Sequence, residues 1–358
     1  AGTTTSPTYQ WQVDIHDMSG FQDMAGENGS TLTLSGITPG MDGYSYRVVV
    51  GGACAPAVPS DEAVLTVHNK PEVGTQPEDT VVCYGENATF TVDAGNTTSP
   101  AIQWQVSYNG GTDWLDLADT AIYAGSSSTM LWLTGVTTGD DGNLYHAVIS
   151  GLCSPQDTSD NVFLTVKERP EIVGQPEDTI VCEGVPALFG VDAGVTTNAG
   201  YQWQVNMNDG DGFQDIGTDS LGIYLGHAQD TLHILVPESR FDGYRYRVIV
   251  SGDCNPAITS ATATLTVHEL PEITVQPVEK TICEEQNTFF SVSSGVTTNP
   301  VYQWQVDMGS GFTDIGADTG VYSGTGTSNL FLTAVPSTID GYLYHVVVSG
   351  ACDPEVTS

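Results

Sequence analysis

The sequence has very few basic residues. Of its 358 residues, 8 are Lys or Arg and 44 are Asp or Glu, which gives a net charge of −36 at pH 7. This excess of negative charge repels the phosphates of nucleic acids and of anionic membrane surfaces, so we expect neither as a partner. Two explanations of the acidity stay open: adaptation to a salty medium, where counterions screen the surface, and binding of cations.

Long apolar runs and catalytic motifs are missing as well. No run of about 18 apolar residues occurs, so we expect no segment of this chain to insert into a membrane. The sequence has no nucleophile motif, phosphate-binding loop or HExxH-type motif, and we therefore expect no enzymatic activity. Val, Thr, Tyr and Ile are frequent instead, together with 40 Gly and 18 Pro. This composition favours strands joined by many turns and predicts an all-β fold.

Two motifs recur four times along the chain. The first, Gln-Trp-Gln-Val, contains Trp11, Trp104, Trp203 and Trp304. The second, Asp-Gly-x-x-Tyr, ends at Tyr46, Tyr145, Tyr246 and Tyr344. A period of about 100 residues fits a complete β-sandwich domain and is too long for one turn of a solenoid. We predict four domains, called repeat 1 (1–68), repeat 2 (69–168), repeat 3 (169–269) and repeat 4 (270–358).

The pattern within one repeat indicates two facing sheets. In repeat 2, the segment Ala88–Val92 alternates apolar and polar residues, and Ile102–Val106 does the same. Clusters of Gly, Asn, Asp and Ser separate these strands. Short segments with one Pro, such as His68–Pro71, join the repeats, and we expect them to restrict bending between neighbours.

The first and last repeats lack strands that the inner repeats have. Repeat 1 begins just before its Trp strand, and repeat 4 stops at Ser358, before the Leu-Thr-Val segment that closes the other three repeats. Half a sandwich leaves an apolar face and open edges. We expect that the chain belongs to a longer polypeptide; alternatively, a neighbouring molecule supplies the missing strands.

These motifs resemble the immunoglobulin superfamily along the whole chain. The resemblance implies that the four Trp and four Tyr listed above form the structural core, and that each Tyr hydroxyl bonds back to the main chain as a tyrosine corner. Where antibody domains carry a disulfide across the core, the repeats have apolar pairs such as Val292 and Val346. The signatures also resemble immunoglobulin-like repeats of large secreted Bacteroidota surface proteins and adhesins exported by the type IX route. That resemblance implies an extracellular or cell-surface location.

Seven Cys occupy two fixed positions of the repeat, which suggests disulfides. Cys83, Cys182 and Cys283 precede one strand, and Cys54, Cys153, Cys254 and Cys352 follow another. One hypothesis pairs them within a repeat, as Cys83 with Cys153, Cys182 with Cys254 and Cys283 with Cys352. In an immunoglobulin sandwich, however, these positions lie at opposite ends, and a ten-residue strand spans roughly 33 Å, whereas bridged Cα atoms lie within about 7 Å. The other hypothesis therefore pairs neighbours, as Cys83 with Cys254 and Cys182 with Cys352.

A few side chains are candidates for binding. Asn206-Met-Asn208-Asp209-Gly210-Asp211 has enough oxygen donors for calcium, although an ordinary hairpin loop explains it better. His146 and His345 stand where other repeats have Arg, and we expect exposed strand positions. Trp114 aligns with Phe21, Phe213 and Phe312, which predicts a packing position, whereas Trp132 lies in an alternating strand and is expected to be buried. The alternative for both Trp is a glycan-stacking platform.

The sequence favours a structural role. Similar sandwiches in series, with short Pro joints and candidate disulfides, fit an extracellular stalk or fibre whose partners are its own neighbouring repeats and copies of itself in a filament. The alternative is an adhesin module that binds glycan or a partner protein through its loops.

Overall fold

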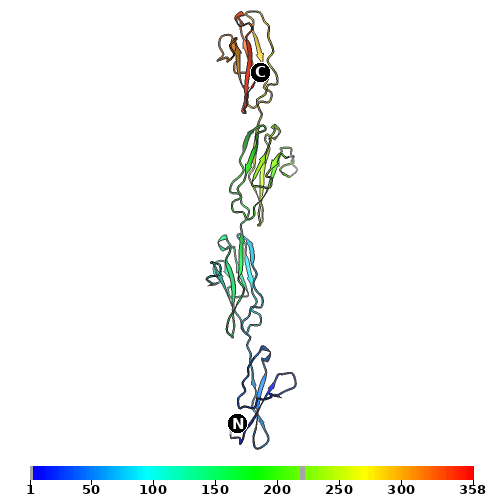
Figure 1. Ribbon diagram of the computed structural model, residues 1–358, viewed down its shortest axis with the longest axis vertical. Coiled ribbons are helices and arrows are strands. Elements are labelled where there is room, and N and C mark those ends of the chain that lie inside the picture. The colour runs from blue at the N-terminus through cyan, green and yellow to red at the C-terminus, as the bar shows by residue number, and fades with distance from the viewer. Residues whose placement is uncertain (1–2, 218–221) are drawn as a thin grey trace. The chain divides into compact units, whose positions relative to one another are not determined.

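A computed structural model describes residues 3–217 and 222–358 of the chain. The chain divides into two compact units, Ala1–Lys167 and Glu168–Ser358, which are described separately. The division falls one residue before the predicted boundary of repeats 2 and 3, and all the predicted domain boundaries stay predictions. In the described residues, secondary structure consists of strands and four 3₁₀ helices: η1 (Pro39–Met41), η2 (Thr138–Asp140), η3 (Ser239–Phe241) and η4 (Ser337–Ile339). The predicted all-β class is therefore confirmed (Figure 1).

Repeat 2, in the first unit, has two sheets. The larger has the order β6-β14-β12-β8-β9, with β13 paired to β12, and the smaller has the order β10-β11-β7. The strands are β6 (Thr80–Cys83), β7 (Ala88–Thr91), β8 (Ala101–Ser107), β9 (Leu115–Asp116), β10 (Tyr123–Ala124), β11 (Met130–Leu133), β12 (Leu144–Ser150), β13 (Asp157–Thr158) and β14 (Val162–Lys167).

Repeat 3, in the second unit, has the same topology. Its larger sheet has the order β15-β23-β21-β17-β18, with β22 paired to β21, and its smaller sheet has the order β16-β20-β19. The strands are β15 (Thr179–Cys182), β16 (Ala187–Gly190), β17 (Gly200–Asn206), β18 (Gln214–Asp215), β19 (Tyr224–Leu225), β20 (Thr231–Ile234), β21 (Arg245–Ser251), β22 (Ile258–Thr259) and β23 (Ala263–His268).

Repeats 1 and 4 have fewer strands. Repeat 1 has one sheet of β1 (Thr8–Asp14), β2 (Gln22–Asp23), β3 (Ser45–Gly51), β4 (Val58–Pro59) and β5 (Ala63–Val64). Repeat 4 has a sheet of β24 (Thr288–Ser291), β28 (Asn329–Leu332) and β27 (Tyr322–Ser323), and a second of β26 (Phe312–Asp314), β25 (Val301–Asp307), β29 (Leu343–Ser349) and β30 (Val356–Thr357). In the described part of repeat 4, no strand corresponds to β15 or β23.

The core of each two-sheet repeat lies between its sheets. In repeat 2, Phe90 and Leu133 of the smaller sheet pack with Trp104 and Tyr145 of the larger. Three such buried clusters occur in the described residues, one each in repeats 2, 3 and 4. Trp11 is only half-buried, although the sequence places it in a core, because the described residues of repeat 1 form no second sheet to cover it.

The last strand of a complete repeat lies between two others. In repeat 3, β23 runs antiparallel to β21 and parallel to β15. The parallel register places Cys182 opposite His268, the last residue of β23. The first cysteine of the repeat therefore lies where the chain leaves that repeat for the next one.

Candidate functional site: the joint between repeats

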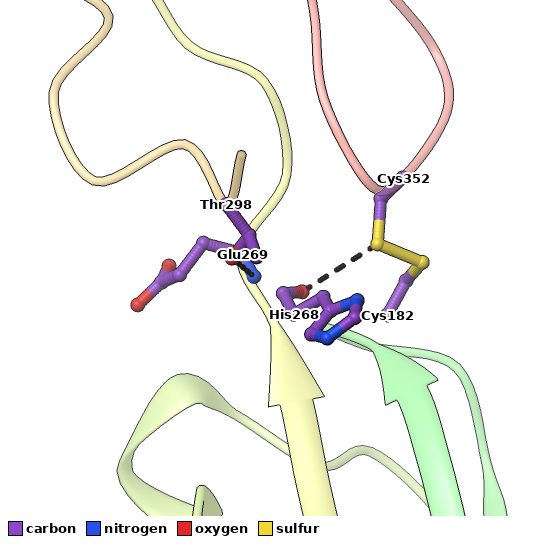
Figure 2. Close-up of a disulfide and its surroundings, with 5 residues drawn as sticks. All are labelled: Cys182, His268, Glu269, Thr298 and Cys352. Carbon is purple, nitrogen blue, oxygen red and sulfur yellow. Dashed lines mark hydrogen bonds between the residues drawn. A yellow bond between two sulfur atoms is a disulfide. The ribbon is translucent and has the colours of Figure 1, made fainter. Parts of the chain in front are cut away.

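A disulfide joins repeats 3 and 4. Cys182, at the end of β15, is bonded to Cys352, in the loop after β29, with the two Cα atoms 5.9 Å apart (Figure 2). The bond agrees with the between-neighbour hypothesis and excludes the pairs of Cys182 with Cys254 and of Cys283 with Cys352. The equivalent bond one repeat earlier, Cys83 with Cys254, stays a prediction.

The backbone joint lies beside this bond. The carbonyl oxygen of His268 is 3.7 Å from the Sγ atom of Cys352 (Figure 2), a van der Waals contact, because a disulfide sulfur has no proton to donate. Repeats 3 and 4 are thus connected twice at one place, by the chain after His268 and by the disulfide.

A threonine holds both connections. Thr298, in the loop between β24 and β25, accepts a hydrogen bond at Oγ1 from the N–H of Glu269, at 2.8 Å (Figure 2). Its carbonyl oxygen accepts a second hydrogen bond, at 2.9 Å, from the N–H of Ala351. Because Ala351 precedes Cys352, Thr298 positions both the incoming chain and the loop that carries the cysteine.

The preceding residue extends this network. Thr297 is buried, accepts at Oγ1 from the N–H of Glu272 at 3.0 Å, and donates to the carbonyl of Ser294 at 2.6 Å. A Cβ atom on Gly350 would lie 2.8 Å from the carbonyl oxygen of Thr298, so only glycine permits this approach of the two loops. No motif recognised in the sequence indicated this threonine pair, although two adjacent threonines recur at the same place in repeats 2, 3 and 4 as Thr97 and Thr98, Thr196 and Thr197, and Thr297 and Thr298.

The joint of repeats 1 and 2 has the same design with a free thiol. The N–H of Asn69 donates to Oγ1 of Thr98 at 2.8 Å, and the Sγ of Cys153 lies 3.5 Å from the carbonyl oxygen of His68. Cys153 is one of three free cysteines in the described residues, with Cys54 and Cys283. The contact between the sulfur and the carbonyl is therefore present at this joint without a disulfide.

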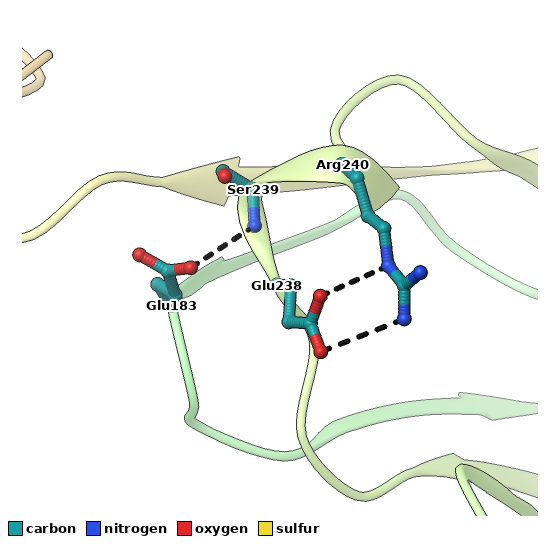
Figure 3. A network of polar contacts seen from close by, with 4 residues as sticks. All are labelled: Glu183, Glu238, Ser239 and Arg240. Atoms are coloured by element: carbon teal, nitrogen blue, oxygen red, sulfur yellow. Dashed lines mark hydrogen bonds and ion pairs between the residues drawn. The ribbon is translucent and has the colours of Figure 1, made fainter. Parts of the chain in front are cut away.

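Glu183, the residue after Cys182, anchors the joint to repeat 3. A carboxylate oxygen of Glu183 accepts from the N–H of Ser239, at the start of η3 (Figure 3). Glu284 has the same role at η4, where it accepts from the backbone and hydroxyl of Ser337. The ion pair of Arg240 with Glu238 beside it is exposed and contributes little to stability (Figure 3).

The core residues named by the sequence lie where β-sheet packing requires them. Trp104, Trp203 and Trp304 are 0% exposed, and their indole N–H groups donate to backbone carbonyls.

The tyrosine-corner expectation named the wrong partner for the tyrosine hydroxyls. Three hydroxyls lie beside the hydroxyl of a second tyrosine, pairing Tyr145 with Tyr123, Tyr246 with Tyr224 and Tyr344 with Tyr322, while Tyr46 is buried in repeat 1. Burial raises the pKa of Tyr145 to about 12.

The aspartate of the second motif makes the bond to the main chain instead. Oδ1 of Asp242 accepts from the N–H of Val267 in β23 at 2.9 Å, and Asp141 and Asp42 bind the equivalent amides at 2.7 and 2.8 Å. This carboxylate holds the last strand of the repeat in place. A short carboxylate can reach an amide one strand away, whereas the tyrosine ring points into the core.

His146 and His345 are not the exposed positions expected. His146 is 7% exposed because its ring stacks on Trp114 with the ring centres 3.7 Å apart, and His345 stacks in the same way on Phe312. The Nε2 atom of His146 lies 2.7 Å from Oε1 of Gln105. Burial lowers the pKa of both histidines. In repeats 1 and 3, Arg47 and Arg247 lie over Phe21 and Phe213, so the stack of a cation or imidazole on an aromatic ring recurs in all four repeats.

The remaining candidates have local roles. Trp132 is 48% exposed, not buried as expected, because it points away from the core side of β11. In the calcium candidate, Asn206 accepts from the N–H of Asn208, and Asp209 accepts from the N–H of Asp211, as in an ordinary Asx-rich loop.

In the described residues, no group of three or more His, Cys, Asp or Glu is arranged to hold a metal ion. No described helix is long and apolar enough to span a membrane.

Comparisons with known proteins support the fold. No protein-family model matches the chain. Endoglucanase C of Cellulomonas fimi is 37% identical over 113 residues, which is 31% of this chain and 10% of that protein, and human hemicentin-1 is 23% identical over 245 residues, 67% of this chain and 4% of that protein. The chain thus spans a small part of the curated relatives it matches. A titin fragment of domains I67–I69 superimposes with a TM-score of 0.56 and 17% identity, covering 81% of this chain and 97% of the fragment. The chain is an array of tandem immunoglobulin-like domains.

Proposed function

We propose that this chain is a structural part of an extracellular or cell-surface protein, a stalk or fibre without catalytic activity. The observation that carries the proposal is the double connection between repeats 3 and 4, through the backbone after His268 and through the bond of Cys182 with Cys352. A second covalent connection limits hinge motion at the joint. Disulfides persist outside the cell, so the bond also supports an extracellular location.

The bond shortens the path along which tension travels. Cys182 and Cys352 are 170 residues apart in sequence, and an extended chain spans at most about 3.6 Å per residue. Roughly 600 Å of chain therefore lies outside the covalent path between the two ends. A stalk or fibre that keeps two objects at a fixed separation benefits from this shorter path. When a repeat unfolds under tension, the disulfide keeps the released chain out of the covalent path, so the end-to-end length increases less than it would without the bond.

Composition and resemblance support the same role. A net charge of −36 keeps neighbouring chains apart and soluble. The repeated motifs are similar to those of secreted Bacteroidota surface proteins, and we propose that setting for this chain.

Single-molecule stretching of the whole chain, held at its two ends, tests the proposal. We expect the fully extended oxidised chain to be shorter than the reduced chain by roughly 600 Å, the length of the 170-residue loop. In the double variant Cys83→Ser and Cys182→Ser, which also removes the predicted bond of Cys83 with Cys254, the length should be the same in the two conditions. Equal lengths for the oxidised and reduced native chain would contradict a tension-limiting role.

A further inference from the structure

The bond of Cys182 with Cys352 gives tension a second covalent route through repeat 3. When the two ends of the chain are pulled apart, tension enters the second unit at Glu168. The shortest covalent route from there runs along residues 168–182, which we call the strut, and crosses the disulfide to Cys352. All strands from β16 to β23 lie inside the loop that the bond closes, so none of them is part of this route.

The strut has little length to release under tension. Its last four residues form β15, and Gly174 makes an antiparallel bridge with Asp192, so both stretches have extended backbone. From residue 168 to residue 182, a straight chain spans at most about 54 Å. An intact disulfide therefore limits how far the two ends of repeat 3 can be pulled apart.

Without the bond, the same tension crosses the pairing of β15 with β23. It enters through the start of β15 and leaves through the end of β23, because the chain after His268 is then the covalent connection to repeat 4. The two strands are parallel, with Thr179 opposite Leu265 and Cys182 opposite His268. The pull acts along both strands in opposite directions, so all pairs of the ladder resist the sliding together.

Two carboxylates hold β23 in this pairing. Oδ1 of Asp178, in the strut, accepts from the N–H of Thr264 at 2.7 Å, and Oδ1 of Asp242 accepts from the N–H of Val267 at 2.9 Å. Asp242 precedes β21 and lies outside the strut. Replacing Asp242 therefore weakens the hold on β23 and leaves the covalent route through the disulfide unchanged.

With the bond in place, the forces on the strut balance. The strut is pulled at Glu168 in one direction and at Cys182 in the other, so its pairing with β23 bears only the difference between the two forces. We propose that the disulfide conducts tension past repeat 3 and keeps its sandwich folded, and that reduction of the bond transfers the tension to the pairing of β15 with β23. This redox-sensitive switch rests on the structural role proposed above.

A thiol reductant operates the switch. In the reaction with a dithiol, the bond between the two sulfurs breaks, Cys182 and Cys352 each receive an electron and a proton, and the dithiol becomes a cyclic disulfide. Cys182 is partly exposed, whereas Cys352 is 4% exposed. We therefore expect the reductant to attack the sulfur of Cys182, with Cys352 leaving as the thiolate.

Stretching single molecules of the full chain at constant force tests the proposal. Cys83 and Cys254 are replaced by Ser, so that the predicted second bond does not form. The oxidised chain is held at a force that unfolds repeat 2, and dithiothreitol, a small dithiol, is then added at the same force. We expect repeats 3 and 4 to lengthen the chain in separate steps, with about 360 Å as the upper limit for the step of repeat 3.

A matched pair of variants identifies the pairing that bears the tension. Asp242→Ala should shorten the lifetime of one step in the reduced chain about tenfold, the effect of a lost hydrogen bond to a charged group, and should alter no step in the oxidised chain. Asp141→Ala makes the same change in repeat 2, which lies outside the loop, and should shorten one step in both conditions.

Three outcomes separate this proposal from the structural role itself. Release of roughly 600 Å in a single step after dithiothreitol is added would show that the sandwiches had unfolded behind the bond, and it would overturn the proposal. Unchanged lifetimes in reduced Asp242→Ala would overturn it too, because the tension would then not cross the pairing of β15 with β23. Equal lengths of the oxidised and reduced chains would instead contradict the structural role on which the proposal rests.

Discussion

Repeats 3 and 4 differ in two strands, since β15 and β23 have no counterparts in the described part of repeat 4, and the difference shows what the closing strand β23 does. Where β23 is present, residues 179–182 form a strand and the core aromatics are buried. In repeat 4, the corresponding residues 280–283 are not a strand, and Phe290 and Tyr344 are partly exposed. The closing strand therefore completes the core and also orders the segment that carries the first cysteine.

Repeat 1 shows the complementary case. Its described residues include β5 in the place of the closing strand but no counterpart of β7, and its Leu32-Thr-Leu34 segment is not a strand, whereas β11 in repeat 2 pairs with β7. The same sequence pattern becomes a strand only when its neighbour is present. Pairing partners therefore decide the local structure of these segments more than their own propensity does.

Loss of the inter-repeat disulfide should have the largest effect. Cys182→Ser opens a 170-residue loop, and the chain-entropy relation gives a loss of about 5 kcal/mol in the free energy of unfolding of the second unit. Urea unfolding under oxidising conditions measures it. Cys283→Ser removes a free, exposed cysteine and is the matched control, for which we expect a change below about 0.5 kcal/mol. Similar losses in both variants would contradict the account.

The aspartate that holds the closing strand should matter in repeat 3 and much less in repeat 4. Asp242→Ala removes the acceptor of the Val267 amide and should cost about 1.5–3 kcal/mol, the usual value for a hydrogen bond to a charged group. Asp340→Ala should cost less than about 0.5 kcal/mol, because no closing strand lies beside it in the described structure. Urea unfolding of both variants measures the two losses of stability. An equal loss in Asp242→Ala and Asp340→Ala would contradict this role of the aspartate.

Thr298 should contribute a smaller amount. Thr298→Val keeps the shape of the side chain and leaves the N–H of Glu269 without its acceptor, at a cost of about 1 kcal/mol. The loop that carries Cys352 should also be less well positioned, so we expect the Cys182–Cys352 bond to form more slowly during oxidative refolding. The rate is measured by quenching samples at successive times and identifying the bond by mass spectrometry. Thr357→Val, at an exposed position of β30, is the control. Unchanged stability and an unchanged oxidation rate in Thr298→Val would contradict the role of Thr298 at the joint.

The smallest effect concerns pH. Burial holds the pKa of His146 below its ordinary value of about 6.5, so the unfolded chain binds the proton more readily than the folded one. The stability of repeat 2 should therefore be complete above about pH 6.5 and fall as the pH drops through that value toward the folded pKa. His146→Arg, which copies repeats 1 and 3, should remove this part of the slope. A steeper fall in the variant than in the native chain, measured by urea unfolding between pH 7 and 5.5, would contradict the assignment.

The sequence predicted features that depend on periodicity and missed those that depend on a contact between loops. The period of the Gln-Trp-Gln-Val motif predicted the sandwiches, and the opposite positions of the two cysteines in an immunoglobulin topology favoured the bond of Cys182 with Cys352. Thr298 was missed because its two hydrogen bonds join residues 29 and 53 positions away, which no local pattern shows. His146 was misplaced because strand alternation does not reveal an aromatic ring that covers the outer face of a sheet.

Disulfide mapping of the native chain tests the central claim most directly. The chain is digested without reduction, with free thiols blocked, and the linked peptides are identified by mass spectrometry. The account predicts Cys182 linked to Cys352 and Cys83 linked to Cys254, with both bonds lost after reduction. A peptide that links Cys182 to Cys254, or Cys283 to Cys352, would show closure within a repeat and would contradict the account.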